Sequence, residues 1–309
     1  MRALVVTNMY PTIERPALGS FVRDQVEALR RIDGVEVELF AFVPGRTIAY
    51  LQAARDLRRT HGTTRFDVVH AHFGLTAWPA FAARSDAHAV TLHGTDLVHS
   101  RSRAITLAAL PFEDLVATVS EPLATELPAW TRRKRRAVLP CGVDTNRFRP
   151  IPRAQARTAL GLPPDVPYLL FPADPTRPEK RYDRAKALAA EENVPLLTLG
   201  KIAPEAVPLW VNAANAVVVP SERESFGLAV LEALACDVPV LATPVGIAPQ
   251  ALHNLAGTLC APFDEAIWRD ALTPHLSDPD PRIDGRARAE AWSADRMAAD
   301  VVAAWRALT

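Results

Sequence analysis

Cysteine is scarce in this 309-residue chain, and no charge dominates it. The three cysteines, Cys141, Cys236 and Cys260, form no closely spaced pair, so neither a disulfide framework nor a zinc site is indicated. The chain has 35 basic and 35 acidic residues, so it lacks the net positive charge that would favour binding to nucleic acid. No apolar run approaches the ~18 residues of a membrane span, and the N-terminus does not read as a signal peptide. We therefore expect a cytoplasmic globular protein with reduced thiols.

Lysine is also rare, because it occurs only at Lys134, Lys180, Lys186 and Lys201 among the 35 basic residues. The chain uses arginine wherever it needs a generic positive charge. A lysine that lies within a motif is therefore a better functional candidate than usual.

The length suggests two domains, at roughly 100–200 residues per domain. Short apolar runs alternate with helical patterns, which predicts parallel sheets covered by helices on both faces. Prolines between 150 and 164 mark a linker, so we expect domains at 1–150 and 151–292, with a helix at 293–309 that can pack on either. The predicted strands are Leu4–Val6, Val35–Leu39, Asp67–Ala71, Ala89–Leu92, Leu115–Val119, Ala137–Leu139, Tyr168–Phe171, Leu196–Leu199, Ala216–Val219 and Val238–Leu241.

The predicted fold class is therefore α/β, with two Rossmann-like, doubly wound domains that face a central cleft. Ser20 is expected to cap a helix in which Val22, Val26 and Leu29 share one face. Ligands of such sheets bind outside the carboxyl ends of the strands. This geometry suits a donor molecule held by one domain and an acceptor held by the other.

The most informative stretch runs from Pro220 to Ala235, where a strand leads through a polar turn into a helix that we expect to begin near Phe226. Glu224 precedes this helix and Glu232 lies eight residues later, about two turns along it. Helix N-terminal amides suit a phosphate, and a carboxylate can accept hydrogen bonds from the hydroxyls of a sugar or ribose. The alternative is a pair of ordinary helix glutamates.

This stretch resembles the E-x7-E motif of the retaining GT-B glycosyltransferases of family 4, and the likeness continues through Cys236–Gly246. The resemblance extends in the same order over about residues 3 to 250, which is more specific than any single motif. The other stretches that carry it are Asn8–Pro11, Gly19–Val22, Asp67–His72, Thr91–Asp96, Val119–Ser120, Leu139–Phe148 and Pro178–Tyr182.

The resemblance implies transfer of a sugar from a nucleoside-diphosphate sugar to a hydroxyl, with retention and without a metal or cofactor. It assigns catalytic roles to His93, Lys180 and Glu224, with His93 beside the transferred sugar and Lys180 on the diphosphate. The further residues that it places around the donor are Gly19, Arg177, Gly200, Lys201, Ser225, Phe226, Gly227, Leu228 and Glu232.

The segment before Lys180 departs from the family pattern. The family has an arginine five residues before the lysine, preceded by glycine, whereas this chain has Pro175 and Asp174 there. Arg177 or Arg181 can supply the missing phosphate contact, and the sequence does not choose between them.

Histidines follow two of the predicted strands. His93 directly follows a buried strand, and Asp96 in the same loop is a weaker candidate. His70 and His72 point to one face of a strand, an arrangement that can suggest metal binding. We do not expect one, because no third ligand lies nearby and the family is metal-independent.

Partners other than the donor are weakly specified. The run formed by Arg132, Arg133, Lys134, Arg135 and Arg136 is either a solvated loop or a contact for anionic lipid or an anionic acceptor, which would place the protein at the inner face of a membrane. No feature favours nucleic acid. The acceptor can be lipid-linked or a small molecule. A nucleotide-sugar epimerase or phosphorylase on the same fold, or a non-catalytic GT-B partner subunit, stays open as an alternative.

Overall fold

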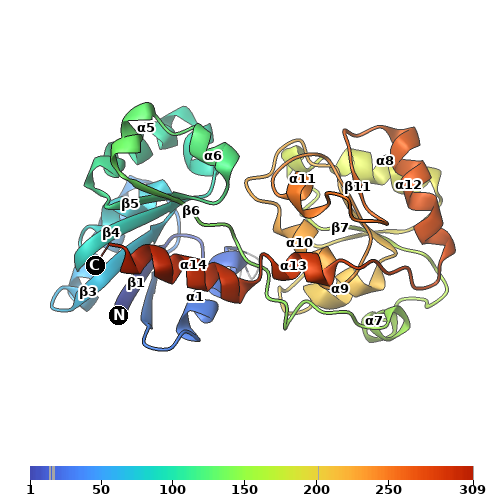
Figure 1. Cartoon of the computed structure of the whole chain (residues 1–309), viewed down its shortest axis with the longest axis horizontal. Coiled ribbons are helices and arrows are strands. Elements are labelled where there is room, and N and C mark those ends of the chain that lie inside the picture. The colour runs from blue at the N-terminus through green and yellow to red at the C-terminus, as the bar shows by residue number, and fades with distance from the viewer. Residues whose placement is uncertain (14, 16–17, 201, 309) are drawn as a thin grey trace. The chain divides into compact units, whose positions relative to one another are not determined.

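The computed structural model describes residues 1–13, 15, 18–200 and 202–308. The chain divides into two compact units: unit 1 comprises Met1–Gly142 and the C-terminal segment from Ala294, and unit 2 comprises Val143–Ser293 (Figure 1). The division falls after Gly142, somewhat before the boundary at residue 150 that the prolines suggested. The C-terminal segment belongs to the same unit as the N-terminus.

Unit 1 is built on a six-stranded, fully parallel sheet with the strand order β2-β1-β3-β4-β5-β6. Leu4, Val5 and Val6 of the interior strand β1 are completely buried, as expected of a parallel sheet covered on both faces. The strands are β1 (Arg2–Thr7), β2 (Glu36–Ala41), β3 (Arg65–His72), β4 (Arg84–Leu92), β5 (Leu115–Thr118) and β6 (Arg135–Val138).

The helices of unit 1 connect these strands. In α1 (Ser20–Arg30), Val22, Val26 and Leu29 are buried on one face, as the spacing predicted. Ser20 is the first helical residue and not the cap, because Gly19 occupies the N-cap position. The others are α2 (Thr47–His61), α3 (Ala77–Ala80), α4 (Thr95–Val98), α5 (Ser100–Ala109) and α6 (Glu121–Thr125), with short 3-10 turns η1 (Gly74–Thr76), η2 (Leu110–Phe112) and η3 (Ala129–Arg133).

The last helix of the chain, α14 (Ala294–Arg306), completes the core of unit 1. It lies against α1, and its apolar stripe of Met297, Val301 and Trp305 is buried there (Figure 1). The indole of Trp305 donates a hydrogen bond to Nδ1 of His70 in β3 at 2.9 Å. The end of the chain therefore holds a side chain at the centre of the sheet.

Unit 2 has a five-stranded parallel sheet with the order β11-β10-β9-β7-β8. Its strands are β7 (Leu169–Phe171), β8 (Leu196–Thr198), β9 (Ala216–Val219), β10 (Val240–Ala242) and β11 (Leu259–Cys260). Its helices are α7 (Arg153–Leu160), α8 (Tyr182–Glu191), α9 (Val207–Ala213), α10 (Leu228–Ala235), α11 (Ala248–Ala251), α12 (Glu265–Ser277) and α13 (Arg286–Glu290), with the turn η4 (Pro178–Lys180). Two Rossmann-like units with parallel sheets confirm the predicted α/β class.

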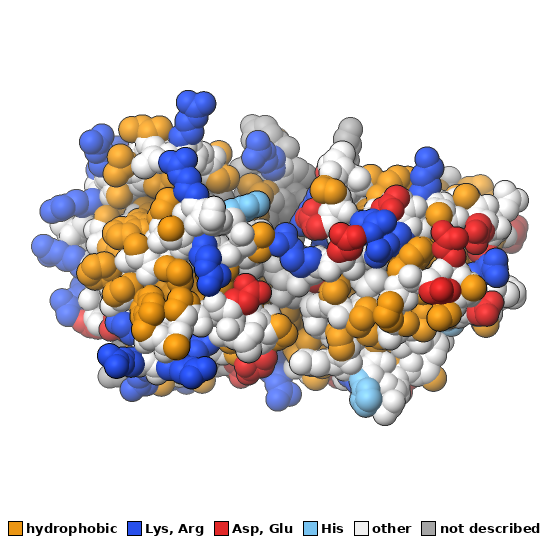
Figure 2. Space-filling view, turned by 90° about the horizontal axis from the view of Figure 1, so that it is seen from above, with side chains coloured by type: hydrophobic (Ala, Val, Ile, Leu, Met, Phe, Trp, Pro, Cys, Tyr) orange, Lys and Arg blue, Asp and Glu red, His pale blue; other side chains and the backbone are white. Residues whose placement is uncertain are grey.

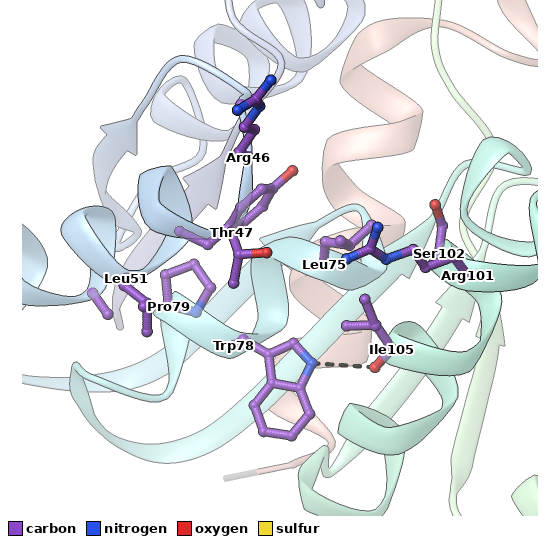
Figure 3. A pocket seen from close by; sticks show the side chains of 12 residues that line it. Arg46, Thr47, Leu51, Leu75, Trp78, Pro79, Arg101, Ser102 and Ile105 are labelled. Carbon is purple, nitrogen blue, oxygen red and sulfur yellow. Dashed lines mark hydrogen bonds between the residues drawn. The ribbon is translucent and has the colours of Figure 1, made fainter.

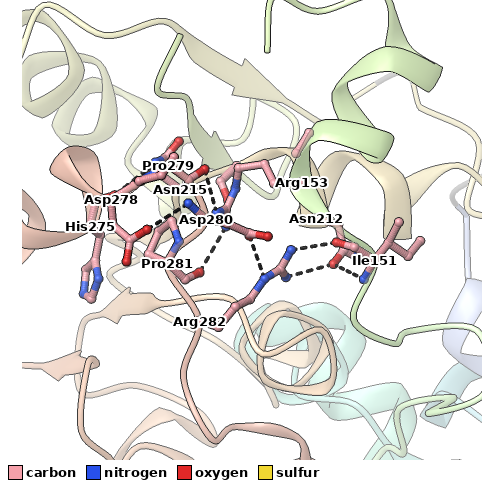
Figure 4. A network of polar contacts seen from close by, with 12 residues as sticks. Ile151, Arg153, Asn212, Asn215, His275, Asp278, Pro279, Asp280, Pro281 and Arg282 are labelled. Carbon is pink, nitrogen blue, oxygen red and sulfur yellow. Dashed lines mark hydrogen bonds and ion pairs between the residues drawn. The ribbon is translucent and has the colours of Figure 1, made fainter. Parts of the chain in front are cut away.

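A buried arginine ties α7 to the rest of unit 2 (Figure 4). Arg153 is 1% exposed, and its guanidinium donates to the carbonyl oxygens of Ala214 and Pro281 and to the Asp280 carboxylate. Burial, together with the nearby Arg282, lowers the pKa of Arg153 to about 9. The charge is retained at neutral pH because each of these acceptors compensates for lost hydration.

Candidate active site

The strongest polar contact among the predicted site residues joins Lys180 to Glu224. The Lys180 Nζ donates to both carboxylate oxygens of Glu224 at 2.6 Å. The two side chains are 15% and 9% exposed, so the pair is largely withdrawn from solvent. Ser221 Oγ donates a third hydrogen bond to Glu224 Oε1 at 2.8 Å. Residues 44 positions apart are thus held together at the carboxyl ends of β7 and β9.

Gly246 packs closely against the loop that carries Glu224. Gly246 has a φ of +59°, and a Cβ at this position would lie 2.3 Å from the Phe226 carbonyl oxygen and 2.8 Å from the Glu224 Cβ. The hydroxyl of Thr243 donates to the backbone carbonyl of Ser221 at 2.5 Å. Only a residue without a side chain fits between these loops, so Gly246 sets the position of Glu224.

The helix that follows Glu224 begins slightly later than predicted. Leu228 is the first residue of α10, Gly227 is its N-cap at φ +95°, and no side chain caps the helix. Phe226 is buried and Ser225 is exposed. Glu232 lies within α10 and is partly buried. The N-terminal amides of this helix and its positive dipole end therefore lie beside the Lys180–Glu224 pair.

The two arginines that could compensate for the departure before Lys180 both have carboxylate partners. Arg177 pairs with Glu179 at 2.7 Å within the same turn and is 54% exposed. Arg181 pairs with Asp183 at 2.6 Å and also with Glu222, and is 28% exposed. Arg181 thus connects the η4 turn to the loop of Glu224, whereas Arg177 has one partner and more freedom.

Two further loops predicted around the donor can be located. A Cβ on Gly200 would lie 3.1 Å from the Cα of Asp174, so the loop after β8 packs against the loop after β7. Lys201 lies outside the described residues. In unit 1, Gly19 has a φ of +64°, and a Cβ there would lie 2.2 Å from the Met9 carbonyl oxygen. Gly19 therefore allows the loop after β1 to contact the start of α1.

His93 belongs to a buried stack of three imidazoles in unit 1. Its Nε2 lies 3.0 Å from His72 Nδ1, and the His72 ring stacks on that of His70 at a centroid distance of 5.1 Å. Because Trp305 donates to His70 Nδ1, His70 Nε2 carries the proton and donates to Thr91 Oγ1 at 2.7 Å. Burial lowers the pKa of His72 to about 4 and holds those of His70 and His93 well below the usual range. All three are neutral at physiological pH.

Asp96 positions the loop that carries His93. Its carboxylate accepts hydrogen bonds from the backbone N–H groups of His93 at 2.6 Å and of Gly74 at 2.8 Å. Burial raises the pKa of Asp96, and the bonds from these amides act in the opposite direction. The rings of Phe21 and Phe73 pack against the His93 ring, with distances between ring centroids of 5.0 and 4.5 Å. Asp96 is therefore a structural support for His93.

The other candidate sites gain little from the structure. Among the described residues, no three His, Cys, Asp or Glu side chains are arranged to hold a metal ion. Within the basic run, Lys134, Arg135 and Arg136 each donate to a backbone carbonyl oxygen of unit 1, so these three are anchored to the protein surface. None of the described helices is long and apolar enough to cross a membrane.

Sequence reasoning overlooked Ser221, Gly246 and the role of His72. Gly246 lies in the stretch that resembles the family, and its type was a signal for a close backbone approach. The contact between His72 and His93 depends on the pairing of β3 with β4, which local sequence patterns do not reveal.

Solved structures share the architecture of both units. Sucrose-phosphate synthase from Thermosynechococcus elongatus superposes with a TM-score of 0.72 at 22% identity, covering 99% of this chain and 98% of that one. The Anabaena protein HepE, solved in complex with UDP and glucose, also gives a TM-score of 0.72, at 17% identity and covering 99% of this chain and 100% of that one. These likenesses define the class of fold as GT-B.

Sequence comparisons identify the family. The family model described as glycosyl transferases group 1 matches residues 173–292, and that of glycosyltransferase family 4 matches residues 16–147. The D-inositol 3-phosphate glycosyltransferase of Mycobacterium avium is 32% identical over 336 aligned residues, covering 91% of this chain and 76% of that protein. Its counterpart in Thermobispora bispora is 28% identical and covers 78% of this chain and 69% of that protein. The chain belongs to the GT-B glycosyltransferases of family 4.

Proposed function

We propose that this glycosyltransferase moves a sugar from a nucleoside-diphosphate sugar to a hydroxyl acceptor, with retention of configuration and without a metal ion or cofactor. The observation that carries the proposal is the contact of Lys180 with Glu224 beside the N-terminus of α10. A cation and helix amides suit a diphosphate, and a carboxylate suits sugar hydroxyls. Donor complexes of the neighbour HepE with UDP and UDP-glucose are consistent with this class of donor.

Negative charge grows on the diphosphate as the bond from the sugar C1 breaks. Lys180 and the amides at the start of α10 are positioned beforehand to stabilise that charge, which is the role that a metal ion plays in other transferases. Glu224 holds Lys180 in place and accepts hydrogen bonds from the sugar, while Glu232 binds the ribose. The leaving phosphate oxygen takes the proton of the incoming hydroxyl, so no protein nucleophile is assigned.

Arg177 is the better candidate for the second phosphate contact. It has a single carboxylate partner in an exposed turn, and exchanging one exposed ion pair for a phosphate costs little. Arg181 would have to leave two carboxylates. His93, neutral and held by His72 and Asp96, serves as a hydrogen-bonding group for the sugar or acceptor.

The test measures transfer from UDP-, GDP-, ADP- and dTDP-sugars in the presence of EDTA. We predict that Lys180→Ala lowers the turnover number by roughly 10²–10³, as expected for loss of a donor that stabilises transition-state charge. Lys186→Ala, an exposed lysine of α8, is the matched control and should retain full activity. Turnover of the Lys180 variant equal to that of the control would refute the assigned role.

Glu232→Ala should raise the donor KM more than it lowers kcat, because a ribose contact is made equally in the ground and transition states. An unchanged donor KM would remove Glu232 from the donor site. Incubation with the donor alone separates the alternatives: an epimerase changes the sugar without an acceptor, whereas a transferase gives at most slow hydrolysis. A non-catalytic subunit would bind the donor and yield no product with any acceptor.

A further inference from the structure

A largely apolar pocket lies within unit 1, apart from the residues assigned to the donor. It has a volume of about 790 Å³ and lies between α2, α3 and α5 (Figure 3). This volume lies within the roughly 300–1,000 Å³ of small-molecule sites. Its apolar lining residues include Leu51, Leu75, Trp78 and Ile105. Trp78 is held in place because its indole N–H donates to the Ile105 carbonyl oxygen at 3.1 Å.

The pocket opens at the same edge of the sheet as the candidate catalytic histidine. Its walls follow β2, β3 and β4 at their carboxyl ends, and His93 directly follows β4. Tyr50, which lines the pocket, accepts a hydrogen bond from Asn8 Nδ2 at 2.9 Å, and Asn8 follows β1. The short helix α4 joins His93 to the pocket residue Arg101. A molecule in the pocket is therefore close to the loops that end these strands.

Two arginines give the pocket a positive charge. Arg46 comes from the start of α2 and Arg101 from α5, and they stand on different sides of the pocket (Figure 3). Neither guanidinium has an ion pair or hydrogen bond in the described part of the chain, and no described lining residue is acidic. Other arginines of unit 1, such as Arg2 and Arg65, pair with carboxylates. These two charges therefore remain available to an anion.

Large apolar side chains are exposed at the pocket and next to it. Trp78 and Leu51 of the lining are 42% and 54% exposed, and Ile48 on α2, outside the lining, is 63% exposed. Figure 2 shows apolar side chains gathered on unit 1, with Lys and Arg side chains around them. Exposed apolar surface of this kind, edged by charge, is typical of a binding site.

We propose that this pocket binds the sugar acceptor, and that the acceptor has an apolar body and carries a phosphate group. The inference rests on the proposed transfer to a hydroxyl. The largely apolar walls favour an acceptor with an apolar body, since they offer few partners to buried hydroxyls. In the described lining, two unpaired arginines and no acidic residue favour an anionic group, and a phosphate monoester, with about −1.5 to −2 charges, brings more negative charge than a carboxylate does.

Calorimetric titration with hexyl, heptyl and octyl phosphate tests the proposal without any donor. Affinity should rise about fourfold for each methylene that enters the pocket. Inorganic phosphate and 1-octanol, which each carry one half of the recognised chemistry, should bind much more weakly. Octanol that binds as tightly as octyl phosphate would contradict the phosphate assignment, and an affinity independent of chain length would contradict the apolar one.

Variants locate the binding. Leu51→Glu places a negative charge in the apolar wall and should abolish octyl phosphate binding, whereas Ile48→Glu, 63% exposed on the same helix but outside the lining, should not. Arg46→Ala and Arg101→Ala should each weaken binding by up to about fivefold, as for exposed ion pairs. Equal affinity in all four variants would overturn the site.

Two other results would replace the proposal. A concentration-dependent dimer in sedimentation that Leu51→Glu dissociates would assign the pocket to a second copy of the chain. Retained nucleotide binding and sugar transfer, together with no octyl phosphate binding, would overturn the acceptor class and leave the transferase proposal intact. A wild-type protein that binds no nucleotide would instead refute the proposed function itself.

Discussion

Replacing His72 by asparagine removes one titrating group from the buried histidine stack while keeping a hydrogen-bonding group near the position of Nδ1. In the folded protein burial lowers the pKa of His72 to about 4, from an ordinary value of 6.5. As the pH falls below 6.5, the unfolded chain therefore takes up a proton that the folded chain refuses. The stabilisation is complete well above pH 6.5 and is lost progressively as the pH falls through 6.5 towards 4.

The size of this effect follows from linkage. A histidine that stays neutral only in the folded state costs up to about 1.4 kcal/mol of stability per pH unit, so His72 alone costs about 2 kcal/mol between about pH 7.5 and pH 5. His70 and His93 add to this loss, since their pKa values are also lowered. Asp96 opposes it, because burial raises the pKa of its carboxyl. The comparison of the wild type with His72→Asn therefore reports the contribution of His72 together with its effect on His70 and His93, whose pKa values it helps to lower.

The assay is hydrogen exchange of the β3 amides, corrected for intrinsic exchange, at several pH values. β3 contains His72, so its opening free energy reports on unit 1 alone. The wild-type protein should lose about 2 kcal/mol more protection than the His72→Asn variant over this range. His99→Asn, which changes an exposed histidine of unit 1, should follow the wild type. Parallel pH profiles for the wild type and His72→Asn would refute the reasoning.

Two substitutions in unit 2 test its packing. Arg153→Met should lower the free energy of unfolding, measured in urea, by roughly 3–5 kcal/mol, because it leaves buried acceptors unpaired. The control is Arg269→Met, since the Arg269 side chain is 46% exposed and lies 3.7 Å from Glu191. It should cost under ~1 kcal/mol. Equal losses would show that the buried network is dispensable. Gly246→Ala should weaken nucleotide binding by displacing Glu224, whereas Gly161→Ala, also at positive φ but with nothing within 4 Å of its added Cβ, should only lose stability. Unchanged nucleotide affinity in Gly246→Ala would separate this glycine from the site.

Most strands could be predicted because buried parallel strands consist of short runs of apolar residues. The Val217–Val219 run and the Leu4–Val6 run are clear examples, and both are fully or nearly fully buried. β11 was missed because Leu259–Cys260 is too short to show a pattern. The helix at the end of the chain could be predicted from its stripe, but its place beside α1 depends on long-range packing.

The candidate site could be predicted from the sequence only in part. Lys180 and Glu224 were named separately, and their direct contact follows from loops at the ends of two strands that are neighbours in the sheet. The pairing of His72 with His93 likewise depends on neighbouring strands β3 and β4. The apolar pocket has no local motif, because its walls come from three helices far apart in the chain.

The central claim is that Lys180, supported by Glu224, binds the diphosphate of a nucleotide donor without a metal. Calorimetric titration of the wild-type protein with UDP, GDP, ADP and dTDP in EDTA tests it most directly. We predict that at least one nucleoside diphosphate binds, and that Lys180→Ala lowers its affinity at least tenfold while Lys186→Ala does not, consistent with loss of a charged hydrogen bond of roughly 1.5–3 kcal/mol. No binding by any of the four, or equal binding by the two lysine variants, would contradict the account.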